Sequence, residues 1–266
     1  MLISNEKFSS WDERRDLAIP GDYKATLRFS AEHFIDVCQK AIKDHGAFFV
    51  ALSGGSTPKA IFEELCSAQY QPRIDWSNVH LFWSDERAVP PDHPDNNYLM
   101  AMNAGFKKER IPKEQIHRMH AEEKLEENAL LYEQTIRKEL QGRPFDLIML
   151  GMGEDGHTAS LFPHTAGLKI KDRLIIANFI PQKKCWRMTM TYECINAASH
   201  IVIYVLGTGK KEMLADVLLS PDQFERLPSQ HIGTKEHKAL WIADTAAAEL
   251  LKKQVYLATP SSKISE

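Results

Sequence analysis

Residues 146–163 read DLIMLGMGEDGHTASLFP, and this segment decides the fold class. Residues 146–150 form a short, almost continuous apolar run, which is typical of a strand buried on both faces of a sheet. The run ends abruptly in a loop of glycines and charged residues. Such a strand, followed by such a loop, indicates a parallel sheet with ligand chemistry at its carboxyl edge.

Apolar, β-prone runs recur along the chain and alternate with amphipathic segments. The predicted strands cover 48–52, 79–83, 146–150, 174–178, 200–206 and 239–242. The predicted helices cover 31–43, 58–66, 97–103, 122–140, 210–218 and 245–252. Strands that alternate with helices predict an α/β protein whose sheet is mainly parallel and covered on both faces.

Composition excludes several classes of partner. The chain has 266 residues and a formal net charge of -3, so no excess of positive charge exists to bind nucleic acid or an anionic membrane. The first 20 residues lack the apolar run of a signal peptide, and no stretch is long and apolar enough for a membrane span. The four cysteines form no C-x-x-C pair, which favours free thiols in a reducing cytoplasm.

Four predicted strands run directly into glycine, hydroxyl or charged residues. These strand ends read SGGSTP (53–58), SDER (84–87), GMGEDGH (151–157) and GTGK (207–210). Because the carboxyl ends of parallel strands share one edge of a sheet, we expect these loops to form a single binding crevice. A small anionic substrate fits this pattern, since a few local cations and backbone N–H groups suffice to hold it.

The loop at 53–58 has the features of an anion cradle. Gly54 and Gly55 allow close approach of the backbone to a ligand, and Ser56 adds a hydroxyl. Thr57 is a suitable N-cap and Pro58 a favoured first helical residue, so a helix N-terminus is predicted to point at the loop. A tight turn without a ligand remains the alternative. Neither a Walker A loop nor a G-x-S-x-G elbow is present.

Residues 151–156 match the dinucleotide fingerprint G-x-G-x-x-G, but the match is misleading. Glu154 and Asp155 lie inside the loop, where they would repel a pyrophosphate, and the following predicted strand ends in Asn178 instead of an acidic residue. His157, just past the glycine turn, is the stronger feature, because an imidazole there can act as a general base near neutral pH. Asp155 could orient it, whereas Asp-x-His alone supplies too few ligands for a metal.

Cations near the same edge could bind a phosphate. Arg87 could form a fork with an anion, and Asp85 could hold a sugar hydroxyl or orient a cation. Arg187 lies in an alternating strand pattern. Lys210 is predicted to begin a helix, where its positive charge opposes the helix dipole, and phosphate binding would explain a lysine at this position. Arg87 either joins Arg187 and Lys210 at the phosphate or forms an ion pair, with Asp155 or at the surface. Solvent exposure is the alternative for Lys210, and Lys211 competes with Lys210 for the phosphate.

Together these motifs resemble the glucosamine-6-phosphate isomerase/6-phosphogluconolactonase family, and in particular its lactonases. The resemblance covers nearly the whole chain in order, and GMGEDGHTASLFP is its most specific motif. The matching segments are SGGSTP (53–58), SDERAVPPDHPDNNYLM (84–100), DLIMLGMGEDGHTASLFP (146–163), RMTMTYECINAA (187–198), VLGTGKKEML (205–214) and WIADTAAA (241–248). Asn96, where the family commonly has serine, and HIG at 231–233 depart from the family pattern.

The resemblance implies a Rossmann-like three-layer α/β/α fold, a single domain over 1–266, and no metal or organic cofactor. It implies hydrolysis of 6-phospho-D-glucono-1,5-lactone to 6-phospho-D-gluconate in the cytoplasmic oxidative pentose phosphate pathway, by a monomer or weak homo-oligomer. His157 and Asp155 are then catalytic. The implied substrate-binding residues are Gly54, Gly55, Ser56, Thr57, Asp85, Arg87, Asn97, Arg187 and Lys210.

Two other functions remain as alternatives. A sugar-phosphate deaminase or isomerase of the same fold carries a glutamate five residues after the histidine, and this chain has Phe162 there. A non-catalytic sugar-phosphate sensor is normally fused to a helix-turn-helix module, and the roughly 25 residues before the first helix of the α/β pattern are too short for one. Both comparisons favour hydrolysis.

Overall fold

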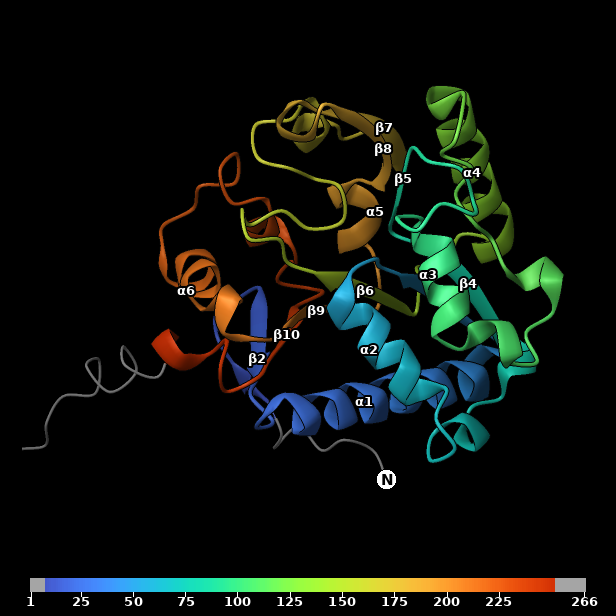
Figure 1. Ribbon diagram of the computed structural model, residues 1–266, viewed down its shortest axis with the longest axis horizontal. Helices are drawn as coiled ribbons and strands as arrows, with labels where there is room; N and C mark the ends of the chain where they lie inside the picture. Colours follow the sequence, from blue (N-terminus) through green and yellow to red (C-terminus); the bar gives the residue numbers. More distant parts are fainter. Residues whose placement is uncertain (1–7, 252–266) are drawn as a thin grey trace, which may run out of the picture.

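The computed structural model describes residues 8–251, which build two β-sheets (Figure 1). The larger sheet has the strand order β1-β2-β10-β9-β6-β3-β4, and the smaller has the order β5-β8-β7. The strands of the larger sheet are β1 (Ser9–Ser10), β2 (Arg15–Ala18), β3 (Phe48–Leu52), β4 (Val79–Trp83), β6 (Leu147–Gly151), β9 (Ile201–Val205) and β10 (Ala239–Ala243). Those of the smaller sheet are β5 (Asp85–Arg87), β7 (Ile175–Ile180) and β8 (Cys185–Met190).

The larger sheet is parallel apart from β1, which pairs antiparallel with β2. Every residue of β3, β9 and β10 is buried, as expected for parallel strands covered on both faces. The prediction of a mainly parallel α/β fold is therefore confirmed. The strand at the centre of the opening segment, β6, lies between β3 and β9, in the middle of the sheet.

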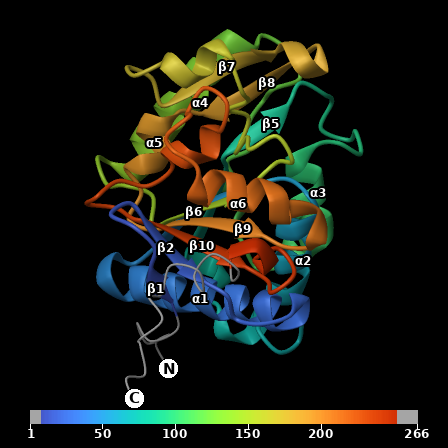
Figure 2. The ribbon, with the colours of Figure 1, turned by 90° about the vertical axis from the view of Figure 1, so that its left-hand side faces the viewer.

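Helices pack on both sheets. They are α1 (Tyr23–His45), α2 (Ser56–Leu65), α3 (Asn97–Ala104), α4 (Leu125–Leu140), α5 (Tyr192–Asn196) and α6 (Lys211–Leu219). α1 and α2 lie on one side of the sheet, whereas α5 and the smaller sheet lie on the other (Figures 1 and 2). α4 packs on the smaller sheet, mainly against β7. Across residues 8–251, every helix is too short or too polar to span a bilayer.

The starts of α1, α2, α4 and α6 differ from the sequence prediction, and α1 and α2 show the physical reason. α1 begins at Tyr23, well before 31, because the side chain of Asp22 accepts a hydrogen bond from the backbone N–H of Ala25 at 2.8 Å and caps the helix. α2 begins at Ser56 with Gly55 as its N-cap, so the predicted Thr57 cap and Pro58 start are wrong. Pro58 still fits, because the backbone nitrogens of the first turn have no partner within the helix.

The predicted strand over 174–178 is present as β7, but in the second, antiparallel sheet. β7 and β8 pair antiparallel through the short turn 181–184, which leaves no room for the crossover that a parallel pair requires. β5, which pairs with β8, lies in a segment for which the sequence predicts a loop after β4. The predicted helix over 245–252 begins with turns at 245–248, and its last residue lies outside the described residues.

The chain order of the strands places a crevice at one point of the large sheet. From β3 the chain passes to β4 on one side and later returns to β6 on the other side of β3. The loops that follow β3 and β6 therefore leave the sheet in opposite directions. In open α/β sheets, ligands bind at such a switch point, outside the carboxyl ends of the strands.

Candidate active site

A cavity of about 180 Å³ opens at this switch point. Loops after β3, β6 and β9 contribute to it, together with β5 and β8 of the smaller sheet. Of the residues proposed from sequence, Asp155 alone does not line the cavity, and it contacts His157, which does. The proposed residues that line it are Gly54, Gly55, Ser56, Thr57, Asp85, Arg87, Asn97, His157, Arg187 and Lys210.

His157 and Asp155 form a hydrogen-bonded pair in the loop after β6. Nδ1 of His157 lies 2.5 Å from Oδ1 of Asp155, and the same carboxylate accepts the backbone N–H of His157 at 3.2 Å. Burial acts to raise the pKa of Asp155, but the hydrogen bond and charge of His157 outweigh it and hold that pKa below its usual value. An ionised carboxylate only accepts, so the proton lies on Nδ1, and Nε2 keeps a free lone pair for a base.

The imidazole is fixed by its neighbours. Phe162 stacks on it, with ring centroids 3.8 Å apart and an interplanar angle of 14°. Gly153 also lies close to it: a Cβ at this position would come within 2.0 Å of His157 Nδ1 and 2.7 Å of Asp155 Oδ1. The glycine is therefore required by the close approach of the His–Asp pair, and nucleotide binding need not be invoked to explain it.

The loop also excludes the dinucleotide interpretation on structural grounds. A Rossmann site needs a helix whose N-terminus meets the pyrophosphate directly after the glycine loop. Residues 152–165 instead form turns and an isolated bridge, with no helix among them.

Asp85, on the wall of the cavity, holds two neighbouring side chains. Its carboxylate accepts hydrogen bonds from Asn97 Nδ2 at 3.2 Å and from Ser160 Oγ at 2.6 Å. Asn97 Oδ1 is buried without a hydrogen-bond partner in the described chain, and a Cβ on Gly54 would lie 1.9 Å from it. Gly54 therefore leaves room for the Asn97 amide, whose oxygen is available to a ligand hydroxyl.

Two arginines face each other across the strand pair β5–β8. Arg87 and Arg187 are direct partners in the antiparallel register, and both line the cavity. Like charges in such a position destabilise a sheet. Nη1 of Arg187 lies 3.9 Å from the Asp85 carboxylate, and Arg87 donates to the carbonyl of Asp95. The Nε atoms of both arginines are buried without a hydrogen-bond partner within residues 8–251. The arrangement favours an anion between the two guanidinium groups.

The contacts of Arg87, Lys210 and Lys211 distinguish between the alternatives that the sequence allows for these cations. Arg87 contacts Asp95 in the segment 89–97 and makes no pair with Asp155, which is engaged by His157. Lys210 lines the cavity at the end of the short 3-10 turn Thr208–Lys210, whereas Nζ of Lys211 lies 3.2 Å from Glu249 and points to a different partner.

The N-terminus of α2 completes the wall of the cavity. Its N-cap is a glycine without a capping side chain, so the first N–H groups of the helix are left for solvent or a ligand. Together with the helix dipole, these groups attract negative charge.

Three further side chains at the site were not predicted from the sequence. Ser160 holds Asp85, Phe162 stacks on His157, and Tyr204 lines the cavity with a buried hydroxyl that has no partner in the described chain. Ser160 and Phe162 lie in the quoted motif, but their partners are set by tertiary contacts. Tyr204 lies in the apolar strand IVIYV and gives no signal in the sequence.

The fold and site define a class: an α/β protein that places an Asp-oriented imidazole beside a cationic pocket. The sequence model of the family described as glucosamine-6-phosphate isomerases/6-phosphogluconolactonase matches residues 21–241. The chain belongs to this family.

Similar proteins agree with this assignment. The 6-phosphogluconolactonase of Chlamydia muridarum is 42% identical over 217 residues, covering 81% of this chain and 82% of the relative. That of Nostoc sp. is 38% identical and covers 89% of this chain and 99% of the relative. The crystal structure of 6-phosphogluconolactonase from Thermotoga maritima superposes with a TM-score of 0.74 at 28% identity, covering 86% of this chain and 98% of that one.

Proposed function

We infer that this protein is an enzyme that hydrolyses 6-phospho-D-glucono-1,5-lactone to 6-phospho-D-gluconate, a step of the oxidative pentose phosphate pathway. The observation that carries the inference is one cavity shared by two features. An imidazole with a free Nε2 lies in it, and so does a pair of arginines facing each other across two strands. The first suits attack of water on an ester carbonyl, and the second suits a phosphate.

We propose that His157 acts first as base and then as acid. Nε2 takes a proton from a water molecule while the water oxygen bonds to C1 of the lactone, and the C1 carbonyl electrons move to its oxygen. The tetrahedral intermediate then collapses, the bond between C1 and the ring oxygen breaks, and the imidazolium returns its proton to that oxygen. Asp155 stabilises the imidazolium between the two steps.

The N-terminus of α2 supports the proposed oxyanion site. When water adds to C1, negative charge develops on the carbonyl oxygen, and preorganised N–H groups stabilise it more than they stabilise the neutral lactone. The N–H groups near Gly54, Gly55 and Ser56 have the required location on the cavity wall.

Arg87, Arg187 and Lys210 are the proposed phosphate ligands. The mutual repulsion of the two arginines is relieved by a dianion, so part of the binding energy comes from removing this strain. Asn97, Ser56 and Thr57 are then the proposed contacts of the sugar hydroxyls, and Asp85 holds Asn97 and Arg187 in place.

Phe162 favours hydrolysis over the deaminase and isomerase chemistry of the wider family. Those reactions move protons at carbon 1 and carbon 2 and call for a second acid–base group beside the histidine. In this chain the corresponding position holds an aromatic ring stacked on His157 at 3.8 Å, which has no proton to exchange.

The test is the rate of 6-phosphogluconate formation from freshly generated lactone, relative to the spontaneous rate, for wild type and His157→Ala. We expect a large acceleration by wild type and a loss of about 10²–10⁴-fold in the variant. His237→Ala is the matched control, because His237 is exposed and lies outside the cavity, and its rate should equal that of wild type. A wild type that fails to exceed the spontaneous rate refutes the function, whereas full activity of His157→Ala refutes only the mechanism.

We also propose that the enzyme works in the cytoplasm as a monomer or weak homo-oligomer. Its four cysteines are free, as expected for a reducing compartment, and burial raises the pKa of Cys38 and of Cys194 to about 12, so these thiols are unreactive. Sedimentation at increasing concentration tests the assembly, and a dimer that persists on dilution would contradict it.

A further inference from the structure

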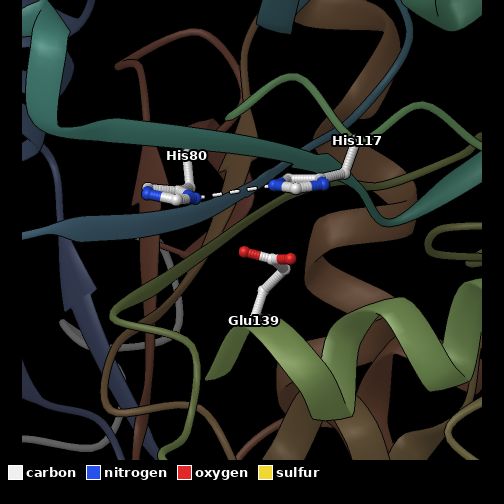
Figure 3. A group of neighbouring side chains, drawn as sticks. All are labelled: His80, His117 and Glu139. Carbon is white, nitrogen blue, oxygen red and sulfur yellow. Dashed lines mark hydrogen bonds between the residues drawn. The ribbon is translucent and has the colours of Figure 1, made fainter. Parts of the chain in front are cut away.

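Two histidines and a glutamate meet on the face of the molecule where α4 passes the edge strand β4. His80 lies in β4, His117 follows the short 3-10 turn Lys113–Gln115, and Glu139 lies in the last turn of α4. One ligand atom of each residue lies within 4.8 Å of the others. The Glu139 carboxylate points toward the gap between the two imidazole rings (Figure 3).

The two imidazoles are held in place by the fold. The backbone N–H of His117 donates to the carbonyl of Leu81 at 2.8 Å, which ties the loop to β4 beside His80. The ring of Phe82 stacks on His117 with centroids 4.3 Å apart, and the ring of Phe49 packs on His80 at 4.6 Å. The histidines are therefore preorganised side by side before any ligand arrives.

The spacing of these atoms fits a transition-metal dication. Nδ1 of His80 and Nε2 of His117 are 3.5 Å apart. Two ligands on one tetrahedral zinc, each at about 2.0–2.1 Å, are separated by about 3.3 Å. Glu139 can close the remaining gap by rotating its side chain, because it is 23% exposed and its nearby cation, Lys138, is an exposed surface residue at 3.4 Å.

We propose that His80, His117 and Glu139 bind a divalent transition metal, with Zn²⁺ as the best match. Two imidazoles and one carboxylate are a donor set that zinc accepts, and a solvent molecule fills the fourth position. All three residues are partly exposed, so the ion has a route in from solvent.

The proposed site is separate from the catalytic cavity and independent of the proposed function. His80 pairs with Phe49 near the amino ends of β4 and β3, whereas the cavity lies beyond their carboxyl ends. The distance along β4 from His80 to Ser84 is about 13 Å at about 3.3 Å per residue. The metal would therefore join β4, the 113–117 loop and α4, and take no part in lactone hydrolysis.

No short motif in the sequence indicates this site, and the proposal departs from the sequence-based prediction of no metal. The three residues are separated by 37 and 22 positions, so no short ligand motif exists. Register places His80 and His117 together, and the packing of α4 adds the carboxylate.

The experiment is calorimetric titration of the full, chelator-treated protein with Zn²⁺, and with Co²⁺ to read coordination from its visible spectrum. Wild type is compared with Glu139→Gln, His117→Gln and His120→Ala. Glu139→Gln keeps the shape of a surface residue, so it should fold normally. His120 is the control, because it is exposed and lies three residues from His117, outside the cluster.

We expect one equivalent of Zn²⁺ to bind wild type and His120→Ala alike. Glu139→Gln should weaken binding at least tenfold and His117→Gln more, with lactonase activity of Glu139→Gln unchanged. Absence of binding by wild type would overturn the proposal. So would wild-type affinity in both Glu139→Gln and His117→Gln, because the ion would then be held by cysteines or other histidines.

Discussion

Gly153, in the loop after β6, offers a sharp test of the His–Asp geometry. In Gly153→Ala, the new Cβ would lie 2.0 Å from His157 Nδ1, 2.2 Å from its Cε1 and 2.7 Å from Asp155 Oδ1. The backbone of Gly153 has no positive φ, so alanine meets no torsional penalty there. The whole effect of the substitution therefore falls on the position of the imidazole and its carboxylate.

The size of the effect follows from the contact distances. An ordinary Cβ contact begins near 3.4 Å, so the imidazole must move by about 1.4 Å to make room. Displacing a catalytic group by about 1 Å can reduce the rate by about 10²-fold, because the base no longer reaches the attacking water in line. We expect kcat to fall by about 10²-fold or more, whereas inhibition by the product 6-phosphogluconate should change little, because the cations are untouched.

Initial rates above the spontaneous background measure the effect, with far-ultraviolet circular dichroism to confirm folding. Gly209→Ala is the matched control, since a Cβ there meets nothing within 4 Å and its φ is not positive. It should retain wild-type activity. If Gly153→Ala keeps more than half the wild-type kcat, the imidazole is either not fixed as described or not the base, and the reasoning fails.

Three further predictions follow from the site. Asp155→Asn should lower kcat at least about 10²-fold, because the amide can donate to Nδ1 and favours the tautomer with a proton on Nε2; an unchanged pH–rate profile would contradict this. Phe162→Leu removes the ring that stacks on His157 and should lower kcat by up to about tenfold, measured as the initial rate above the spontaneous background; an unchanged kcat would contradict this. Burial raises the pKa of Glu86 from 4.5 to about 7, although three backbone N–H groups donate to its carboxylate and act to lower it. The folded protein therefore favours the neutral carboxyl, and this contribution to stability is complete below pH 4.5 and is lost as the pH rises through 7. Urea unfolding should therefore show up to about 3 kcal/mol less stability near pH 8 than near pH 5 from this residue, and Glu86→Gln should remove that dependence; an identical pH dependence in both proteins would refute the shift.

The sequence predicted the central architecture well because the signal is local. Residues 48–52 and 79–83 match β3 and β4 at both ends, since a short apolar run between polar residues can be read without its neighbours. The second sheet was harder. β5 is the tripeptide Asp85–Arg87, and a strand made of charged residues has no apolar alternation to recognise.

The proposed site residues met in one cavity because parallel strands deliver their loops to a common edge, which is a rule that sequence order alone can apply. What each side chain does there could not be derived in the same way. Asp85 contacts Asn97 and Ser160, and Arg87 stands opposite Arg187, only because β5 joins a second sheet.

The amino-acid sequence was enough to predict the α/β class, a binding crevice at the carboxyl edge of the sheet, and His157 with Asp155 as the proposed catalytic pair, because these predictions depend on hydrophobic runs and on residues close in the chain. Three arrangements could be found only in the folded chain: Arg87 opposite Arg187, the Phe162 ring stacked on His157, and the group of His80, His117 and Glu139. These depend on strand register and helix packing, which bring together residues that are distant in sequence.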